Sequence, residues 1–455
     1  MATIINSKIG IHKEKRRVYL QGRKLARQGV EPGQHFNVIE QGDNLILEIN
    51  PNGKYKVSRR QSNGELLPVI DLRVDEIAKL FEGVDTIRAA VKAGKIVISA
   101  HHQNTKIKAR EARLAEKLAT GKPLDKASIF HGGGVLDKAI QAGLKSAGVK
   151  SRIAVAVEIE SNYLESSLAN NPELFDDDSI VIESPVQMVN LKNAPEVDVV
   201  VAGIPCTGAS KSGRSKGKLE FAESHSEAGA LFFSFLQVVQ VLNPALVIME
   251  NVSEYANTSS WVVIRSVLAS LGYTLQETVL NGNEFGALEN RNRLCAVAVS
   301  NGIAVGDIKG ITPVREKEAC LNDVLEPIAL DDARWKSFDY LAKKEARDKA
   351  AGKGFSRQLL TGLEAFCGTI GRGYAKCRST EPFLMHPLIE SLSRILTPVE
   401  HARVKGIPES VVNGLSDTIA HEVLGQSVIY PVFEAVAKWL GLELCAAHSQ
   451  TAMAA

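Results

Sequence analysis

Short apolar runs alternate with amphipathic segments through the middle of the chain. The apolar runs lie at residues 153–159, 198–205 and 245–251, and helical patterns lie at 231–242 and 261–272. Strands that are apolar on both faces and separated by helices are typical of a parallel sheet covered on both sides. The pattern therefore predicts an α/β fold with a doubly wound, mostly parallel, Rossmann-like sheet.

The remaining chain differs in style. Its 455 residues suffice for two or three domains. Residues 1–103 hold short β-branched runs between Gly turns, which predicts a β-rich module, and residues 104–126 predict a helical linker. Residues 305–390 are irregular, and helical character returns from 391 to 445. No internal repeat is evident.

Charge is distributed unevenly along the chain. The net charge is +2, but residues 1–125 carry 23 Lys and Arg against 14 Asp and Glu. A basic N-terminal part indicates a polyanionic partner, and a merely solvated basic surface is the alternative.

Composition excludes several classes of protein. The apolar fraction of 45% and charged fraction of 23% are ordinary for a globular protein. The longest apolar stretch, 231–242, is too short to span a bilayer, and the N-terminus lacks the layout of a secretory signal. Six cysteines without a CxxC pair predict neither a disulfide scaffold nor a metal site. We expect a cytoplasmic location.

A Gly-rich turn follows the first expected strand of the α/β region. Phe130, Gly132 and Gly134 stand between a short strand and a helix, where glycines allow a ligand to approach the backbone. Glu158 and Ile159 end the next strand, where a carboxylate can accept hydrogen bonds from ribose hydroxyls. The segment predicts a nucleotide-like cofactor site, with a simple turn as the alternative.

A thiol stands at the end of the next apolar run. Pro205 and Cys206 follow the strand directly, and a polar TGAS segment comes after them. The carboxyl edge of such a sheet is where ligands bind. Cys is more often a small buried apolar residue than a nucleophile, but a packing role does not require a turn that presents the thiol.

Two further strand ends carry charged side chains. Glu250 ends a run of apolar residues, so partial desolvation would raise its pKa and suit an acid. Arg291 and Arg293 are two residues apart and share a face if the backbone is extended. They predict a site for an anion or a base edge. The alternatives are a surface carboxylate and a salt-bridged edge strand.

Taken together, these motifs resemble the DNA (cytosine-5) methyltransferase family from Ser128 to Leu440. Its F-x-G-x-G loop resembles 130–134, its ribose-binding acid falls on Glu158, and its Pro-Cys motif falls on 205–206, with Ser210 closing that motif. Its remaining motifs are similar to Glu250–Val252, Glu289–Arg293, the segment from Arg394 to Pro408, and Gly425–Pro431. The resemblance implies that Pro205, and Gln426, Ser427 and Val428 of the last motif, bind the cofactor.

The chain departs from the family pattern at four positions. Ser128 and Ser184 stand where the family usually has Asp, Glu289 stands where it has Gln, and Gln426 where it has Asn. None of these is the nucleophile or the acid, so the departures bear on cofactor affinity and fine geometry.

The resemblance implies methylation of carbon 5 of cytosine in DNA, with S-adenosyl-L-methionine as donor, S-adenosyl-L-homocysteine as product and no metal. It implies that Cys206 adds to C6 of a flipped-out base, that Glu250 acts at N3, and that Arg293 holds O2 while Arg291 braces the site. It implies a class I methyltransferase catalytic domain at 127–304 plus 391–445 and a target-recognition region at 305–390.

Basic residues near these motifs predict contacts with double-stranded DNA. Ser210, Lys211, Arg214 and Lys216 lie in a Gly- and Ser-rich segment expected to close over the flipped base, with a disordered loop as the alternative. Arg372 and Lys376 lie in the target-recognition region and are as suited to phosphates as to bases.

The N-terminal module resembles the swapped-hairpin DNA-binding modules of bacterial transcription regulators. This implies dimerisation and nonspecific DNA affinity, and an inert extension is the alternative. For the whole chain we expect a bacterial, nucleoid-associated enzyme. An RNA (tRNA) cytosine-5 methyltransferase and a noncatalytic DNA-binding regulator of the same fold are the rival interpretations.

Overall fold

The computed structural model describes residues 2–205, 223, 229–352 and 356–454. Cys206 and the basic segment after it lie outside the described residues. The chain divides into two compact units, Met1–Ala109 (unit 1) and Arg110–Ala455 (unit 2). Each unit is described separately below.

Unit 2 is built on a seven-stranded sheet with the order β13-β12-β11-β14-β15-β17-β16. The first five strands are parallel, β17 is antiparallel to its neighbours β15 and β16, and β16 therefore runs in the same direction as the first five. The α/β fold expected from the apolar runs is confirmed. The strands are β11 (Leu124–Ile129), β12 (Ser151–Glu158), β13 (Ile180–Glu183), β14 (Val199–Gly203), β15 (Leu246–Val252), β16 (Tyr273–Asn281) and β17 (Asn292–Ser300).

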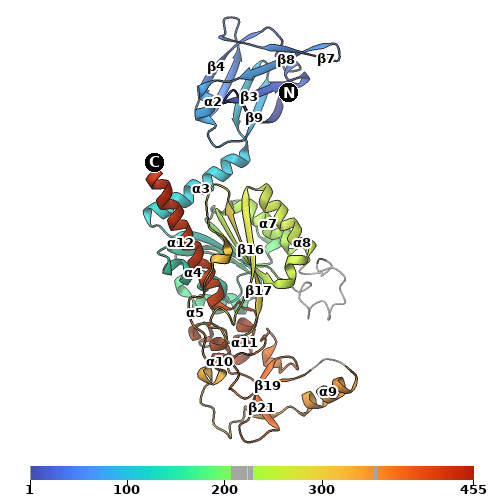
Figure 1. Cartoon of the computed structure of the whole chain (residues 1–455), viewed down its shortest axis with the longest axis vertical. Helices are drawn as coiled ribbons and strands as arrows, with labels where there is room; N and C mark the ends of the chain where they lie inside the picture. Colours follow the sequence, from blue (N-terminus) through green and yellow to red (C-terminus); the bar gives the residue numbers. More distant parts are fainter. Residues whose placement is uncertain (1, 206–222, 224–228, 353–355, 455) are drawn as a thin grey trace. The chain divides into compact units, whose positions relative to one another are not determined.

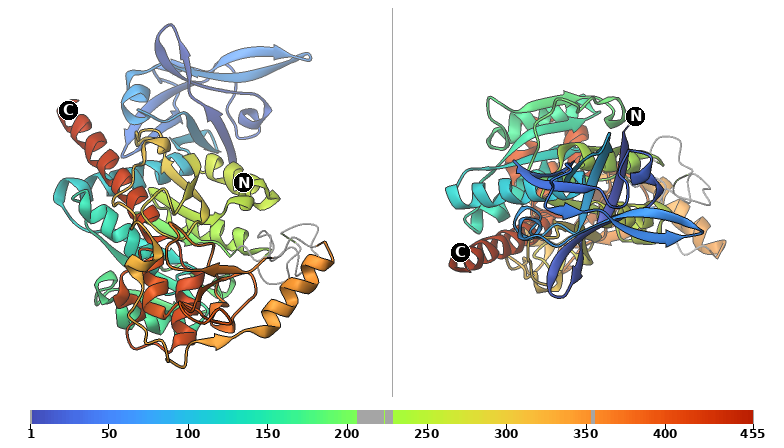
Figure 2. Two further views of the ribbon diagram at one scale, coloured as in Figure 1. Left: turned by 60° about the horizontal axis from the view of Figure 1, so that its bottom comes forward. Right: turned by 90° about the horizontal axis from the view of Figure 1, so that it is seen from above.

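Helices cover both faces of this sheet (Figures 1 and 2). Along β14, Val199 and Val201 pack into one core cluster with α4 (Val135–Ser146) and α12 (Tyr430–Ala454). Val200 and Ala202 pack into the other with α7 (Leu231–Leu242) and α8 (Ser259–Ser270). Alternate residues of a strand point to opposite faces, which is why the run had to be continuously apolar. The further helices of this region are α5 (Ser161–Asn170), α10 (Pro398–Val404) and α11 (Asp417–Gln426).

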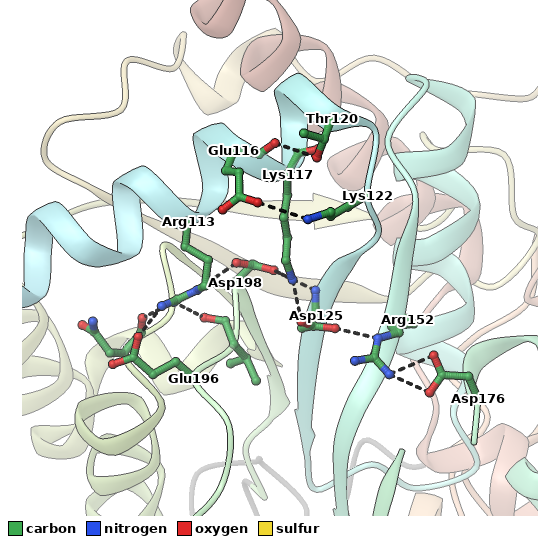
Figure 3. Close-up of polar contacts among 12 residues, drawn as sticks. Arg113, Glu116, Lys117, Thr120, Lys122, Asp125, Arg152, Asp176, Glu196 and Asp198 are labelled. Carbon is green, nitrogen blue, oxygen red and sulfur yellow. Dashed lines mark hydrogen bonds and ion pairs between the residues drawn. The ribbon is translucent and has the colours of Figure 1, made fainter. Parts of the chain in front are cut away.

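The second half of α3 (His102–Thr120) is attached to the amino ends of the parallel strands (Figure 3). Lys117 donates from its Nζ to the carboxylates of Asp125 and Asp198. Arg113 bonds Asp198 at 3.0 Å, and the Asp198 side chain is fully buried. The segment expected to be a linker helix is therefore a helix whose C-terminal half belongs to unit 2.

The region expected to be irregular contains a small four-stranded sheet with the order β18-β21-β20-β19. Its elements are β18 (Lys336–Ser337), α9 (Asp339–Ala350), β19 (Gln358–Leu360), β20 (Pro382–Met385) and β21 (Leu392–Arg394). These strands have two to four residues, too few to show a period in the sequence. Short 3-10 helices of unit 2 lie at Pro172–Leu174, Val186–Met188, Ser253–Asn257, Ile308–Gly310, Leu321–Val324, Tyr374–Lys376 and Glu409–Val412.

Unit 1 consists of two sheets, with the orders β1-β9-β10-β5-β4-β6 and β2-β3-β8-β7, around one core. The strands are β1 (Thr3–Lys8), β2 (Gly10–His12), β3 (Lys15–Gln21), β4 (His35–Gln41), β5 (Asn44–Ile49), β6 (Tyr55–Lys56), β7 (Ser58–Ser62), β8 (Glu65–Leu72), β9 (Thr86–Lys92) and β10 (Lys95–Ala100). The short helices are α1 (Arg23–Ala26) and α2 (Asp75–Leu80).

Unit 1 is an internal duplication, so the expectation of no repeat was wrong. The first half runs from β1 to β5 and the second from β6 to β10, with a helix before the last two strands of each. Core residues recur 51 or 52 positions apart, and all are 2% exposed or less. The equivalent pairs are Val18 and Ile70, Leu20 and Leu72, Leu25 and Ile77, Val30 and Phe81, Phe36 and Ile87, Leu45 and Ile96, and Leu47 and Ile98.

The strand register shows that the two halves are related by an approximate two-fold axis. In the β5–β10 pair, Leu47 lies opposite Ile96 and Leu45 opposite Ile98, so exchanging equivalent residues returns the same pairing. The β3–β8 pair behaves in the same way. The repeat escaped sequence inspection because the two halves share apolar character at these positions but few identical residues.

No helix among the described residues is both long enough and apolar enough to cross a membrane.

Candidate active site

Most of the motif residues in unit 2 gather at the carboxyl edge of the parallel strands. Five neighbouring strands run in the same direction, so the loops after β11, β12, β14 and β15 leave from one edge. β17 runs the opposite way and begins at that edge, because Arg293 lies opposite Val252. Cys206 follows β14 by three residues and lies outside the described residues.

Glu250 and Arg293 form an ion pair at this edge. The Arg293 Nε lies 2.8 Å from the Glu250 Oε1, and each side chain is 14% exposed. Glu250 lies beside Gly203 of β14 and Cys295 of β17. Burial raises the pKa of the Cys295 thiol to about 12, and the nearby Glu250 carboxylate adds to the shift. β17 lies between β15 and β16, so the edge-strand alternative for Arg293 was wrong.

Asn251 holds the end of β14 in place. Its Nδ2 donates to the Ile204 carbonyl at 3.1 Å, and Asn251 is 3% exposed. A buried amide bond of this kind fixes the backbone immediately before Pro205, which is half-buried. The side chain after Glu250 therefore positions the segment that leads to Cys206.

Glu158 is bound to the backbone of the Gly-rich loop. Its Oε2 accepts from the Gly132 amide at 2.6 Å, and its Oε1 accepts from the Ile159 and Glu160 amides at 2.9 and 3.0 Å. Carboxylate oxygens offer about four acceptor sites, so one remains for a further donor. Ile159 is 60% exposed, which places an apolar side chain at the surface beside this carboxylate.

The loop itself adopts a conformation that depends on glycine. Gly132 and Gly134 have φ of +59° and +77°, and Phe130 adopts +61° without being glycine. A Cβ on Gly134 would lie 2.3 Å from the Ser167 hydroxyl, and one on Gly132 would lie 3.6 Å from Nε2 of Gln426. The side chain of Gln426 is thus a neighbour of Gly132.

The side chains of Ser427 and Val428, which were expected to bind the cofactor, contact other parts of the protein instead. Ser427 donates its hydroxyl to the Val423 carbonyl at 2.5 Å, and Val428 is 4% exposed within the core.

A buried polar cluster under the Gly-rich loop was missed in the sequence. His131 contacts the Ser128 hydroxyl through Nδ1 and the Ser167 hydroxyl through Nε2, both at 2.8 Å. Asp137 accepts from Ser128, and Lys126 lies 3.7 Å from its other oxygen. Burial opposes ionisation of Asp137, but the nearby Lys126 and the hydrogen bonds outweigh it and lower its pKa. Ser128, which departs from the family pattern, thus contacts a carboxylate nine residues later.

Arg291 lies in the interior, apart from the Glu250–Arg293 pair. Its guanidinium contacts Glu289 at 3.3 Å and donates to the carbonyls of Ile370 and Gly425 at 3.2 Å. Lys405 completes this group, with Nζ 3.4 Å from Glu289. Burial opposes ionisation of Glu289, but the two cations lower its pKa. Burial also lowers the pKa of Lys405 to about 7.

The residues expected to bind DNA are only partly described. Arg372 lies 3.5 Å from Glu160 and over the ring of Tyr163, so it contacts the segment after Glu158. Lys376 is exposed in the same loop. Ser184, one of the departures from the family pattern, follows β13 and donates its backbone N–H to the Glu158 carbonyl. Ser210, Lys211, Arg214 and Lys216 lie outside the described residues. Within the described ranges, no three His, Cys, Asp or Glu side chains gather as a metal site requires.

Comparison with known proteins places these motifs in one family. The model of the C-5 cytosine-specific DNA methylase family matches residues 127–441. The Type II methyltransferase M.NlaX of Neisseria lactamica is 28% identical over 315 residues, which cover 68% of this chain and 94% of the relative. The Type II methyltransferase M.HhaI of Haemophilus parahaemolyticus is 27% identical over 286 residues, covering 58% of this chain and 81% of the relative.

Solved structures agree in fold. The crystal structure of the S. pombe Dnmt2 methyltransferase has a TM-score of 0.55 at 19% identity and covers 71% of this chain and 98% of that chain. At such identity the likeness concerns the fold alone. Together with the match over residues 127–441, the arrangement of Glu250, Arg293 and Glu158 around one sheet edge leads to one conclusion. The chain belongs to the C-5 cytosine-specific DNA methylase family.

Proposed function

We propose that this DNA cytosine-5 methyltransferase acts through a covalent bond between Cys206 and C6 of a flipped-out cytosine, with S-adenosylmethionine as methyl donor. The observation that carries the proposal is the Glu250–Arg293 pair at 2.8 Å, beside Gly203 at the end of the strand that leads to Cys206. We assign catalysis to residues 127–304 and 391–445 and target recognition to residues 305–390.

The residues around the Gly-rich loop fit an adenosyl cofactor. Glu158 keeps an acceptor site for a ribose hydroxyl, and exposed Ile159 offers an apolar surface to a base. Phe130, Gly132 and Gly134 would contact the methionine part, and Gln426 lies beside Gly132. When bound, S-adenosylmethionine supplies an electrophilic methyl group on sulfur.

The chain's own residues activate the cytosine. The Cys206 thiolate adds to C6 and makes C5 nucleophilic, because the ring becomes an enamine. Glu250 donates a hydrogen bond or proton to N3, and Arg293 holds O2, so the negative charge that develops on the ring meets a fixed acid and a fixed cation. After methylation at C5, loss of the C5 proton and expulsion of the thiolate restore the aromatic ring.

The proposed substrate is a cytosine in double-stranded DNA, extruded because C5 and C6 are unreachable within the stack. Ser210, Lys211, Arg214 and Lys216 are proposed to contact the DNA around the extruded base, as are Arg372 and Lys376. We place the enzyme in the cytoplasm, where bacterial DNA lies. Dimerisation through the N-terminal module stays a prediction.

A covalent trap tests the mechanism. DNA containing 5-fluorocytosine in place of cytosine blocks proton loss at C5, so the adduct accumulates when the cofactor is present. We expect wild-type protein to form a complex that survives denaturing electrophoresis and Cys206→Ser to form none while still binding the duplex. The control is Cys445→Ser. Cys445 is half-buried on α12 and lies far along the sequence from the motifs at the sheet edge.

The outcome of the trap decides between the rival interpretations. A stable adduct with Cys206→Ser, or none with wild-type protein, contradicts the assigned nucleophile. Transfer to tRNA but not to duplex DNA under the same conditions contradicts the proposed substrate. A noncatalytic regulator would bind DNA and transfer no methyl group to either.

A further inference from the structure

The internal duplication of unit 1 allows its two halves to be compared within one chain. At equivalent positions of α1 and α2 the buried residue stays apolar, with Leu25 matching Ile77. Of the three exposed pairs, two reverse their charge and the third stays basic. Arg23 matches Asp75, Lys24 matches Glu76, and Arg27 matches Lys79. A requirement of the fold acts on both halves, so the basic character of α1 has another cause.

Ion pairs between the halves support this view. Arg23 on α1 lies 2.8 Å from Glu65 at the start of β8, while Asp75 on α2 lies 3.5 Å from Lys15 at the start of β3. Each pair joins one half's helix to the other half's hairpin, with the signs reversed. The fold therefore accepts either sign at this contact, and Lys24 has no ion pair among the described residues of unit 1.

The basic residues of α1 line a groove. Arg23 and Arg27 are four residues apart on one face of the helix and border an open groove of about 580 Å³ with Ala26, Glu65, Leu66 and Leu67. Glu65, Leu66 and Leu67 belong to β8, whose hairpin with β7 is seen in Figure 1. The groove combines two guanidinium groups with a single carboxylate.

Arg59 on β7 extends this surface. It lies opposite Pro68, and Gln61 lies opposite Leu66, so Arg59 shares a hairpin face with the groove residue Leu66. Arg59 belongs to the second half, and its equivalent in the first half is Ile11 on β2, because Ile11 pairs with Arg16 as Arg59 pairs with Pro68, the equivalent of Arg16 in β8. The surface of α1 and the β7–β8 hairpin thus presents four exposed cations, Arg23, Lys24, Arg27 and Arg59. At the equivalent positions, the symmetry-related surface of α2 and the β2–β3 hairpin presents Asp75, Glu76, Lys79 and Ile11.

We infer that the surface formed by α1 and the β7–β8 hairpin binds the phosphate backbone of duplex DNA through Arg23, Lys24, Arg27 and Arg59, and that the symmetry-related surface formed by α2 and the β2–β3 hairpin does not. Exposed cations of this kind bind DNA by neutralising phosphates and do not read sequence. The inference rests on the proposed function in one respect, because it takes the polyanion that binds this surface to be DNA. It makes DNA binding by unit 1 one-sided although the fold is two-fold.

Binding of a duplex that is not a substrate tests the inference. A fluorescent duplex of about 30 base pairs containing only A and T holds no cytosine, so it isolates backbone binding. The full chain with Arg23→Ala, Lys24→Ala and Arg27→Ala is compared with a control of equal charge change in the second half, Lys79→Ala, Arg88→Ala and Lys92→Ala, all exposed.

We expect the first triple variant to bind about tenfold or more weakly at low salt, with the slope of log K against log salt shallower by about 2 to 3, and the control to change less than about twofold. Equal losses in both variants, or no loss in the first, would overturn the inference. Circular dichroism checks that both variants are folded. Methyl transfer and the fluorocytosine trap on the same preparations show separately whether the proposed function holds, because neither involves the A·T duplex.

Discussion

At the scale of single residues, the departure at Glu289 shows how a buried charge is accommodated. Glu289 stands where the family pattern has a neutral amide, and its carboxylate is fully buried. Two cations balance it, Arg291 at 3.3 Å and Lys405 at 3.4 Å. Lys405 also donates to the carbonyls of Leu424 and Ser427, so the group connects the segment before β17 with the end of α11. The interior therefore accommodates the Glu289 carboxylate because Lys405 and Arg291 balance its charge.

We predict that Glu289 and Lys405 are energetically coupled. Lys405→Met should lower the free energy of unfolding by about 3 kcal/mol, because it leaves Glu289 with half of its compensation in a buried site. The double variant Glu289→Gln, Lys405→Met should recover most of the loss. Urea denaturation followed by tryptophan fluorescence measures this, and additive effects of the two substitutions would contradict the coupling.

How far individual site residues could be predicted depended on where their partners lie in the sequence. Glu158, Glu250 and Arg293 each stand at a strand end, so the strand pattern alone brought them to one edge. Asp137 and Lys405 could not be found in this way. Asp137 is hidden in the amphipathic pattern of a helix, and the partners of Lys405 come from segments far away along the chain.

At the scale of elements, the attachment of α3 to the sheet gives a second test. Lys117 is 14% exposed and bridges Asp125 and the fully buried Asp198, whereas Lys122 pairs with Glu116 at the surface (Figure 3). Lys117→Met should destabilise unit 2 by about 1.5 to 3 kcal/mol, because it removes charge-assisted hydrogen bonds to a buried carboxylate. Lys122→Met, two residues after the end of this helix, should stay within about 0.5 kcal/mol. Similar losses in both variants, measured by denaturant titration, would show that α3 is held by other contacts.

The contact between α10 and α11 predicts a dependence of stability on pH. His401 and His421 face each other with their Nδ1 atoms 3.0 Å apart, and Tyr374 packs edge-on against both rings. Burial lowers the pKa of His421 to about 4, against the opposing effect of Asp417 and Glu400. Because its pKa is lower in the folded state, the unfolded chain takes up the proton first, so this contribution to stability is complete above pH 6.5 and is lost as pH falls towards 4.

His421→Asn removes this titration while keeping a polar atom near the His401 Nδ1. Between pH 6.5 and 4.5 the melting temperature of the variant should fall less steeply than that of the wild type, with carboxylates contributing equally to both profiles. Parallel profiles would show that the histidine pair does not limit stability in acid.

Among the elements, long apolar ones were predictable and polar ones were not. The runs behind β12, β14 and β15 and the helices α7 and α8 were expected within a few residues, because burial on one or both faces imposes a period. In unit 1, strands were expected at 16–20, 35–39, 44–49, 55–60 and 95–99, so β1, β2, β8 and β9 were missed. β8 contains Pro68 and ends on a charged segment, and β9 contains Arg88 and two alanines between its larger apolar residues Ile87 and Val91. Missing β8 and β9 also concealed the repeat, because they are the equivalents of β3 and β4.

At the scale of the whole molecule, each unit has its own hydrophobic core. The core of unit 1 is drawn only from residues up to 100, and the clusters of unit 2 begin at Leu114. Units with separate cores are able to unfold as separate cooperative transitions. The three tryptophans of the chain, Trp261, Trp335 and Trp439, all belong to unit 2, so their fluorescence reports on that unit alone.

We predict that a core substitution in one unit leaves the unfolding of the other unchanged. Leu47→Ala, at a position 1% exposed in unit 1, should cost about 2 to 5 kcal/mol and shift part of the circular dichroism transition without moving the fluorescence midpoint. Leu268→Ala on α8, which is fully buried, should shift the fluorescence midpoint by a similar energy. If Leu47→Ala moved both signals together, the two units would unfold in one transition. The charge variants of α1 could then change the stability of unit 2 as well as that of unit 1. Two independent transitions instead mean that the DNA-binding surface of unit 1 can be altered while the site at the sheet edge of unit 2 stays intact.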